Sequence, residues 1–312
     1  MVSKRAVIFG GSGFLGRAIA STLGDEFRVV VADNFSRNHR AQDSRIEVVE
    51  CDVLDRDTVF EVTKGADIVV NLAFINGTRN FYSRPREIAS VAVRGQINVI
   101  DASNAHNVES FVYASSSEVY QTPSHIPTCE DVGLVIPDIK NPRYSYGGGK
   151  IIGEYLTKYF LKPSINSTIF RPHNIYGPHM GFDHVIPELC LKAVRARAKN
   201  VQNIEVIGSL DTTRSFCFID DFASAFNLLV TRNFTGTVNI GSGVETSISE
   251  VLAVLSDLLE FEFFPVPSLE SHAGSASRRC PDITILESLG FVPKTPLREG
   301  LQAVLRNLSA EV

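Results

Sequence analysis

Several features are scarce in this 312-residue sequence, and each absence excludes a class of protein. The five cysteines lie far apart, with no CxxC pair and no Cys/His ligand spacing, so we interpret them as free thiols in a reducing compartment. No segment approaches about 18 apolar residues, and the N-terminus leads directly into a strand pattern, so we expect a cytoplasmic protein without a membrane span. The 30 Lys and Arg residues are scattered and the formal net charge is -5, which argues against a nucleic-acid partner.

Short apolar runs alternate with helical stretches from Arg5 to about Phe170. The expected strands are 6–9, 28–32, 46–50, 67–71, 110–114 and 167–170. The expected helices between them are 14–23, 55–63, 85–106 and 145–160. Such alternation is typical of crossover helices on both faces of a parallel sheet. It predicts an α/β fold of the Rossmann type, with a doubly wound parallel sheet.

The pattern changes after Arg171, where loops rich in Pro, Gly and His appear. Here we expect helices near 185–198 and 249–259, and short strands at 204–207 and 237–240. These elements are too few for a second independent core. We therefore expect residues 1–171 to form the Rossmann domain and residues 172–312 to form mainly a smaller C-terminal lobe, with a soft boundary across which the two parts can interleave.

A glycine-rich turn, Gly10-Gly-Ser-Gly-Phe-Leu-Gly16, lies between the first expected strand and helix. Glycine there permits a tight turn and close approach of the backbone to a pyrophosphate, while the helix N-terminus supplies free N–H groups. Asp33 ends the second strand, where a carboxylate can bind both adenosine ribose hydroxyls and repel a 2′-phosphate. NAD is therefore favoured over NADP, although Arg37 and Arg40 lie nearby.

Two further strand ends fit the same cofactor. Asp52 follows the third strand, where a carboxylate can accept a hydrogen bond from the adenine amine, and small residues follow the fourth strand at 71–73. The predicted NAD-binding residues are Gly10, Gly13, Phe14, Leu15, Gly16, Asp33, Asn34, Asp52, Val53, Leu72, Ala73 and Lys150.

Tyr146 and Lys150 are spaced i and i+4, so on a helix they lie on one face. An unperturbed tyrosine has a pKa near 10, and a nearby ammonium and the positive nicotinamide ring both favour the phenolate. We expect Tyr146 to act as a general base, with Lys150 tuning it and holding the nicotinamide ribose. Three serines, 115–117, end the fifth strand, and one of them can share a hydrogen bond with Tyr146 and a reacting hydroxyl.

Together these motifs resemble the extended short-chain dehydrogenase/reductases, which include the nucleotide-sugar epimerases and dehydratases. The resemblance rests on the glycine-rich turn, Asp33, Asp52, Asn71-Leu-Ala, Ser-Ser-Ser-Glu-Val-Tyr at 115–120 and Tyr146-x-x-x-Lys150, and it covers essentially the whole chain. It implies that Ser116, Tyr146 and Lys150 are catalytic, with Glu118 as a further candidate.

The resemblance continues beyond residue 171. Phe-Arg-Pro-His-Asn-Ile-Tyr-Gly-Pro at 170–178 is similar to the family stretch in which an asparagine, here Asn174, contacts the diphosphate of a sugar nucleotide. The segments around Arg214 and Arg279 resemble family segments too, and two arginines can neutralise a diphosphate. Asn76 and Ser117 complete the candidate substrate contacts. The resemblance also implies a homodimer formed through helices 85–106 and 145–160.

We expect no metal site. The clustered histidines His173, His179 and His184 lack a partner carboxylate at ligand spacing, so we interpret them as polar residues of a substrate loop.

Family chemistry implies that Tyr146 takes the proton of the sugar C4 hydroxyl as hydride passes to NAD⁺, giving a 4-keto sugar. The 4,6-dehydratases that this stretch resembles have an aspartate and a glutamate directly after the hydroxyl residue. This chain has Ser117 and Glu118 after Ser116, so the aspartate is missing. Ser-Glu-Val-Tyr is also similar to UDP-glucuronate decarboxylases, but their loop after the fourth strand is missing. A 4-epimerase needs the fewest extra groups. We predict UDP-glucose 4-epimerase-like chemistry, with a 4,6-dehydratase, a decarboxylase and a non-catalytic NAD-binding sensor as alternatives.

Three positions depart from the family pattern: Gln121 stands for a glycine, Arg94 for an asparagine, and three glycines follow Tyr146. We hypothesise that Arg94 pairs with Glu118 or with a substrate acid. Each glycine costs a helix about 1 kcal/mol relative to alanine. We therefore expect residues 147–149 to admit something close, either the partner subunit's helix or the loop around 171–181.

Overall fold

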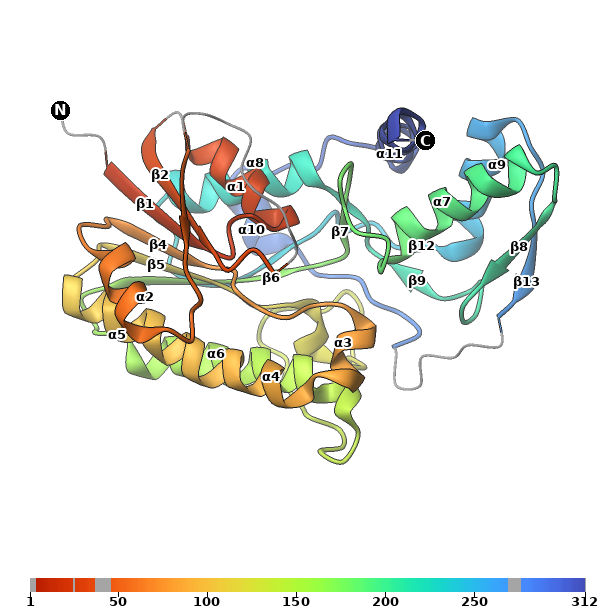
Figure 1. Ribbon diagram of the computed structural model, residues 1–312. Coiled ribbons are helices and arrows are strands. Elements are labelled where there is room, and N and C mark those ends of the chain that lie inside the picture. The colour runs from red at the N-terminus through yellow and green to blue at the C-terminus, as the bar shows by residue number, and fades with distance from the viewer. Residues whose placement is uncertain (1–3, 25, 37–45, 269–275, 312) are drawn as a thin grey trace.

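The computed structural model describes residues 4–24, 26–36, 46–268 and 276–311. Within these ranges the central sheet has seven parallel strands in the order β11-β6-β5-β4-β1-β2-β3 (Figure 1). Their bounds are β1 Lys4–Phe9, β2 Phe27–Asp33, β3 Glu47–Glu50, β4 Ile68–Asn71, β5 Ser110–Ala114, β6 Asn166–Pro172 and β11 Gly236–Ile240. The strand order reverses between β1 and β4, so the carboxyl ends of these strands form a crevice suited to a ligand.

Helices cover both faces of the sheet, as Figure 1 shows. One face carries α1 Phe14–Leu23, α8 Ile219–Thr231 and α10 Thr284–Ser288. The other carries α2 Arg56–Thr63, α4 Pro85–Ser90, α5 Gln96–His106 and α6 Ser145–Phe160. Because both faces are buried, the strands are nearly continuous apolar runs such as Ala6–Phe9, which is fully buried. The predicted doubly wound α/β fold is confirmed.

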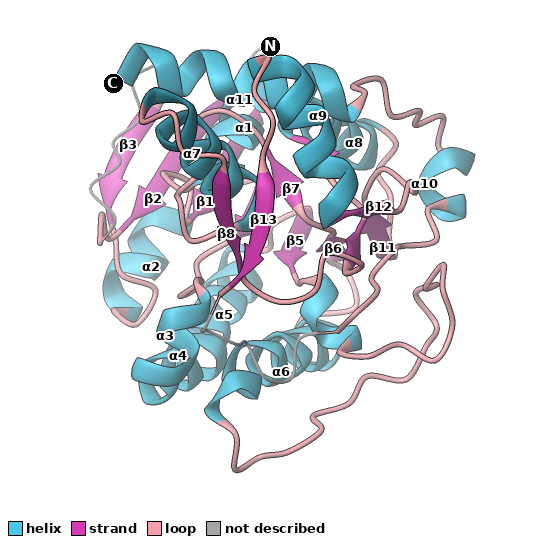
Figure 2. Cartoon of the chain, turned by 90° about the vertical axis from the view of Figure 1, so that its right-hand side faces the viewer, coloured by secondary structure: helices cyan, strands magenta, loops and turns pink. Residues whose placement is uncertain are grey.

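A smaller lobe packs beside the carboxyl edge of the sheet and faces the viewer in Figure 2. Its helices α7 Val185–Ala198, α9 Ile248–Leu259 and α11 Leu297–Glu311 share one apolar cluster. Strand β8 Asn203–Val206 pairs in parallel with β13 Phe264–Pro267. Two short ladders join the lobe to the sheet domain: β7 Ile175–Tyr176 with β10 Cys217–Phe218, and β9 Thr213–Arg214 with β12 Thr246–Ser247.

The chain crosses between the two parts more than once. The strand expected at 237–240 is β11, which pairs with β6 in the central sheet, and α8 packs on that sheet rather than in the lobe. Three helices besides α8 were not predicted: α3 Thr78–Ser83, α10 and α11. The expected helix 85–106 contains a π-helical segment, Val91–Gly95, where a Cβ on Gly95 would lie 2.8 Å from Val53 Cγ2.

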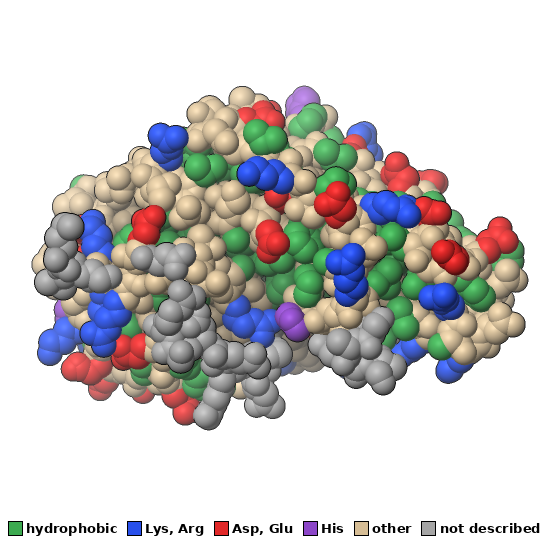
Figure 3. Space-filling model, turned by 90° about the horizontal axis from the view of Figure 1, so that it is seen from above, with side chains coloured by type: hydrophobic (Ala, Val, Ile, Leu, Met, Phe, Trp, Pro, Cys, Tyr) green, Lys and Arg blue, Asp and Glu red, His purple; other side chains and the backbone are tan. Residues whose placement is uncertain are grey.

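Charged side chains of both signs are interspersed on the face shown in Figure 3. This mixing agrees with the mild formal net charge of -5. No helix among the described residues is long and apolar enough to cross a membrane.

Candidate active site

A cleft of about 910 Å³ opens at the carboxyl ends of the central strands and extends to the lobe. The following predicted site residues line it: Gly10, Gly13, Phe14, Leu15, Gly16, Asp33, Asn34, Asp52, Val53, Leu72, Ala73, Asn76, Ser116, Ser117, Glu118, Tyr146, Lys150, Asn174 and Arg279. Arg214 is buried behind this surface and does not line it. The fold thus brings together residues that are up to 269 positions apart, from Gly10 to Arg279.

The glycine-rich turn forms one end of the cleft. Gly10 has a φ of +73°, and a Cβ there would lie 2.7 Å from the backbone nitrogen of Ala73. The turn after β1 and the segment after β4 therefore touch through bare backbone, which a side chain would block. Gly13 precedes α1 and has no side chain to cap it, so the first N–H groups of the helix face the cleft. This arrangement fits a pyrophosphate.

Asp33 lies directly beside that turn. Its carboxylate accepts hydrogen bonds from the backbone N–H groups of Ser12 at 3.0 Å and Phe35 at 2.9 Å. The amide of Asn34 donates to Asp52, whose carboxylate also accepts from the backbone of Leu54. The two acids are therefore held at the same end of the cleft, in positions that fit a ribose and an adenine. Arg37 and Arg40 lie outside the described residues.

Tyr146 and Lys150 lie in the first two turns of α6 and are both buried. The Tyr146 ring stacks on Phe81 at 4.8 Å and meets the edge of Phe74 at 5.1 Å between centroids. Lys150 Nζ donates to the carbonyl of Ala114 at 2.7 Å and lies 5.8 Å from the centre of the Tyr146 ring. Burial lowers the pKa of Lys150 to about 7. The ammonium is thus close enough to favour a phenolate on Tyr146.

Ser116 begins a 3-10 helix, Ser117–Tyr120, at the end of β5. Its Oγ accepts the backbone N–H of Glu118 at 3.1 Å, which leaves the hydroxyl proton of Ser116 to donate elsewhere. The Glu118 carboxylate is held by Arg279 Nη1 at 2.8 Å and lies 3.4 Å from Arg143 Nη2. Burial opposes ionisation of Glu118, but Arg279 and Arg143 outweigh it and lower its pKa to about 2.

The remaining predicted contacts lie around this centre. Asn174, with a φ of +42°, lines the cleft, and its side-chain oxygen has no hydrogen-bond partner among the described residues. Arg279 Nε and Nη2 are likewise buried without a partner there. Burial and the charge of Arg279 lower the pKa of Arg214 to about 10. Arg279 Nε and Nη2 can therefore donate to an anion, whereas the side-chain oxygen of Asn174 can only accept a hydrogen bond.

The glycines of α6 have close neighbours in their own chain. A Cβ on Gly147 would lie 2.5 Å from Gln121 Nε2, and one on Gly149 would lie 2.9 Å from Ala92 Cβ and 3.0 Å from Phe74 Cζ. The hypothesis that the loop around 171–181 approaches these glycines is wrong, and no partner helix is needed to explain them. The glycines let the 3-10 turn and the wall of the cleft close tightly on the start of α6.

The hypothesis that Arg94 pairs with Glu118 is also wrong. Arg94 is exposed in the π-helical segment, whereas Glu118 pairs with Arg279 and Arg143. Arg143 was not predicted as a site residue, although it lies only three residues before Tyr146, within one helical turn. Glu154 was missed too. It lies one turn beyond Lys150 and is bound by Arg171.

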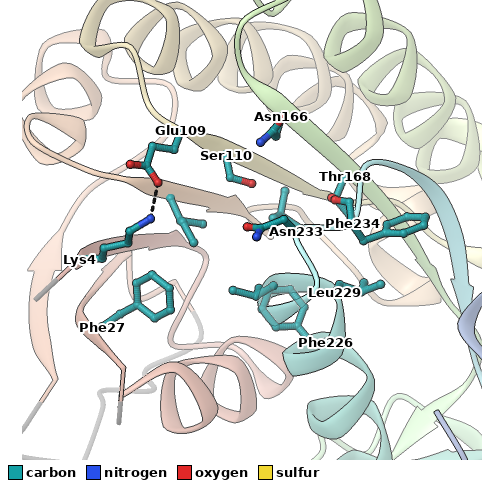
Figure 4. Close-up of a pocket in the computed structure, with 13 residues that line it drawn as sticks. Lys4, Phe27, Glu109, Ser110, Asn166, Thr168, Phe226, Leu229, Asn233 and Phe234 are labelled. Carbon is teal, nitrogen blue, oxygen red and sulfur yellow. Dashed lines mark hydrogen bonds and ion pairs between the residues drawn. The ribbon is translucent and has the colours of Figure 1, made fainter. Parts of the chain in front are cut away.

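A second cavity, of about 80 Å³, lies at the opposite edge of the sheet. Figure 4 shows it beside the Lys4–Glu109 ion pair and α8 residues such as Phe226. Lys4 and Ser110 are the first residues of their strands, so this cavity lies at the amino ends, away from Tyr146. It therefore forms no part of the candidate active site.

Among the described residues, no cluster of His, Cys, Asp and Glu is arranged to hold a metal ion. His173 is fully buried, with Nε2 3.1 Å from the side-chain oxygen of Asn239. Burial lowers the pKa of His173 to about 3. This side chain is therefore a neutral part of the core. His179 and His184 line the cleft.

A sequence model of the NAD dependent epimerase/dehydratase family matches residues 6–241, which is more than half of the chain. The chain belongs to the NAD-dependent epimerase/dehydratase family. Its cofactor is NAD, as the glycine-rich turn and Asp33 predicted. The family comprises enzymes that act on nucleotide sugars, among them epimerases, dehydratases and decarboxylases.

Relatives within the family differ in their reactions. The chain is 29% identical over 310 residues to GDP-mannose 3,5-epimerase 1 of Oryza sativa subsp. japonica, covering 96% of this chain and 80% of the relative. It is 27% identical over 322 residues to the UDP-N-acetyl-alpha-D-glucosaminuronate decarboxylase of Bacillus cytotoxicus, covering 98% of each chain. Family membership therefore establishes the cofactor and the substrate class of the relatives, and leaves the reaction of this member open.

The fold is shared with solved members of the family. A variant of UDP-glucuronic acid 4-epimerase from Bacillus cereus, in complex with NAD and a fluorinated UDP-glucuronic acid, superposes with a TM-score of 0.85 at 21% identity, covering 99% of this chain and 100% of that one. NAD also fits this chain on its own geometry. Gly10 to Gly16 and the start of α1 would hold the pyrophosphate, Asp33 the ribose, and Lys150 the nicotinamide ribose.

Proposed function

We propose that the protein epimerises a nucleoside-diphosphate sugar at C4 through a 4-keto sugar. The observation that carries this proposal is the arrangement around Tyr146. Lys150 lies one turn along the same helix, Ser116 ends the adjacent strand, and the neighbouring carboxylate of Glu118 is held in ion pairs. This set can move a proton at one sugar hydroxyl without further acid–base groups.

Bound NAD⁺ would accept the C4 hydride in the oxidation and return it to the opposite face of C4 in the second half of the reaction, so that the cofactor is unchanged overall. Tyr146 Oη takes the proton of the C4 hydroxyl, and the Lys150 ammonium stabilises the resulting charge distribution. Ser116 Oγ donates a hydrogen bond to the same sugar oxygen. After the keto sugar has rotated in the cleft so that its other face meets the cofactor, Tyr146 returns the proton to the C4 oxygen, which becomes the hydroxyl of the epimer. Asn174, through its side-chain N–H groups, and Arg279 hold the diphosphate during this rotation, and the buried Arg214 adds positive charge beside Arg279 without lining the cleft.

Glu118 argues against a 4,6-dehydratase. Elimination of water requires a group that can give a proton to the leaving hydroxyl. Because Arg279 and Arg143 lower its pKa to about 2, Glu118 is ionised at neutral pH and has no proton to give. Position 117, where the dehydratases that this stretch resembles have an aspartate, is a serine. Glu118 is therefore better suited to orient Arg279 and a sugar hydroxyl.

Decarboxylation of a sugar acid is the second candidate. The unpartnered, buried N–H groups of Arg143 and Arg279 next to Glu118 would suit a carboxylate on the sugar. A decarboxylase is also among the full-length relatives. A 4-keto sugar acid would lose carbon dioxide after the same first oxidation, so the two candidates share Tyr146 and differ in the fate of the intermediate.

We also propose that the active form is a cytoplasmic homodimer built through α6 and the neighbouring segment 85–106. The outer face of α6 exposes Ile152, Tyr155 and Tyr159, which follow one another at helical spacing. Val93 on the adjacent segment is exposed as well. A second copy would cover this apolar strip.

The test is incubation with a panel of UDP-, GDP-, dTDP- and CDP-sugars in the presence of NAD, followed by mass spectrometry and NMR. A product of unchanged mass with inverted C4 supports the epimerase. Loss of water or of carbon dioxide would replace it with the dehydratase or the decarboxylase. If every sugar nucleotide is returned unchanged and the cofactor stays oxidised, the result would favour a non-catalytic NAD-binding sensor.

Tyr146→Phe removes the phenolic proton acceptor and should lower kcat by about 10²–10⁴-fold, the usual contribution of a general base. Tyr155→Phe, on the exposed face of the same helix, is the matched control and should keep the wild-type rate. Turnover retained by the Tyr146→Phe variant would contradict the mechanism for any of the three reactions.

A further inference from the structure

A buried carboxylate lies next to the Tyr146–Lys150 pair, and the proposed mechanism does not use it. Glu154 follows Lys150 by four residues on α6, so the two side chains lie on one face of the helix. The Glu154 side chain is only 10% exposed. A carboxylate in such a place is costly unless other groups hold it and use its charge.

Two neighbouring side chains, from separate segments, hold this carboxylate. Arg171 on β6 donates from Nε to Oε1 at 2.9 Å and from Nη2 to Oε2 at 2.7 Å. Ser115, the residue before Ser116, donates its hydroxyl proton to Oε1. Arg171 is held in turn by Tyr120 Oη at 2.7 Å and by the carbonyl of Glu130 at 2.9 Å. The carboxylate therefore has little freedom to turn away from Lys150.

Lys150 itself is in a place that disfavours its charge. Only 3% of the residue is exposed, and Nζ lies 3.9 Å from the centre of the Phe74 ring. The titratable groups that face it are Tyr146 on α6, Tyr113 on β5 and Glu154, and burial holds the pKa of Tyr113 well above its usual value. Burial lowers the pKa of Lys150 to about 7, and Glu154 opposes that change.

We propose that Glu154 is a positioning residue that keeps Lys150 protonated in its buried site, with Arg171 and Ser115 fixing the carboxylate for that purpose. The effect of this protonation on catalysis rests on the proposed function, in which the positive charge of Lys150 supports a phenolate on Tyr146. The protonation of Lys150 itself can be measured without any substrate.

Arg171 is the group that could cancel the effect, because it places a positive charge against Glu154. It donates to both carboxylate oxygens of Glu154, which is the geometry of a charge-assisted ion pair. Removing Glu154 alone would also leave Arg171 unpaired and repelling Lys150. The experiment must separate the loss of the carboxylate from the appearance of an unpaired guanidinium.

The test is an NMR titration of ¹³Cε-labelled lysine, with the Lys150 signal assigned from its absence in Lys150→Arg. Glu154→Gln keeps the shape and removes the charge, and it should lower the measured pKa of Lys150 by about one unit or more, a tenfold change in its equilibrium. The double variant Glu154→Gln/Arg171→Gln removes both charges, which avoids a buried unpaired ion and keeps the test available if the single variant does not fold. Glu130→Gln, in the same buried network but not facing Lys150, is the matched control and should leave the titration unchanged.

A lower pKa in both the single and the double variant supports the proposal. A change confined to the single variant would assign the effect to the unpaired Arg171 and would overturn the proposal. An unchanged titration in either variant that folds would overturn the proposal as well.

Once a substrate is identified, the alkaline limb of the kcat profile, where Lys150 loses its proton, should move to lower pH in Glu154→Gln. A merely structural defect would lower kcat at every pH without moving that limb. If no sugar nucleotide reacts, the proposed function fails while the titration still decides the role of Glu154.

Discussion

Lys150, to which the proposed mechanism assigns a role, is held in a place that weakens the fold. It is buried at 3% exposure, and its ammonium has the carbonyl of Ala114 as its hydrogen-bond partner. Its pKa is lowered from 10.5 to about 7 because burial disfavours the charged form. Between these two values the unfolded chain binds more protons than the folded one, so the free energy of unfolding should rise with pH over that range.

Lys150→Met should therefore stabilise the cofactor-free protein at pH 7. The penalty for holding the buried ammonium is roughly 3–5 kcal/mol from the size of the pKa change, and the loss of the donor to Ala114 offsets about 1–3 kcal/mol of the gain. The advantage of the variant should shrink as the pH rises toward 10. Urea unfolding at pH 7 and 9.5 measures this difference, and an equal gap at both values would contradict the argument.

At the scale of elements, the glycines of α6 differ in what packs against them. Its buried side meets Tyr113 at Gly153, where a Cβ would lie 2.0 Å from the phenolic oxygen. Gly148, by contrast, faces Ile136 Cδ1 at 3.1 Å, the far end of a partly exposed side chain. The same substitution in one helix thus meets a rigid ring at one position and a movable methyl group at the other.

Gly153→Ala should destabilise the protein by about 1–3 kcal/mol, because the clash with Tyr113 exceeds the gain of about 1 kcal/mol in helix propensity. Gly148→Ala should be neutral or stabilise by up to about 1 kcal/mol. The free energy of unfolding in urea compares the two variants. Equal effects would show that packing around α6 does not decide where it carries glycine.

At the scale of the whole molecule, an apolar strip on α6 is exposed to solvent. Tyr155 and Tyr159 on α6 are 58% and 65% exposed, and their rings are 4.7 Å apart. No residue of this strip lines the cleft. A dimer through this face would leave both clefts open to substrate.

Changing both Tyr155 and Tyr159 to Glu should convert the proposed dimer into a monomer, because two carboxylates would face their copies across the interface. Phe264→Glu, on exposed strand β13, is the control and should leave the assembly unchanged. Sedimentation equilibrium measures both. A wild-type monomer, or a variant that stays dimeric, would remove this face as the interface.

Local patterns determined much of the molecule from the sequence alone. Short apolar runs predicted six of the central strands within one or two residues, because the inner strands are buried on both faces. The glycine-rich turn, Asp33 and the Tyr146–Lys150 spacing indicated the cofactor, since each motif acts within a few residues of chain. Helices α8 and α11 were missed, because the pattern after residue 171 was interpreted as loop-rich.

Only the tertiary structure decided which distant groups meet. Glu118 pairs with Arg279, 161 residues away, and with Arg143 rather than with Arg94. Gly147 and Gly149 are explained by Gln121, Ala92 and Phe74, which sequence spacing does not bring together. The physical reason is the range of the interactions. Periodicity and turn chemistry act between near neighbours, whereas ion pairs and close packing depend on how the sheet, α6 and the lobe come together.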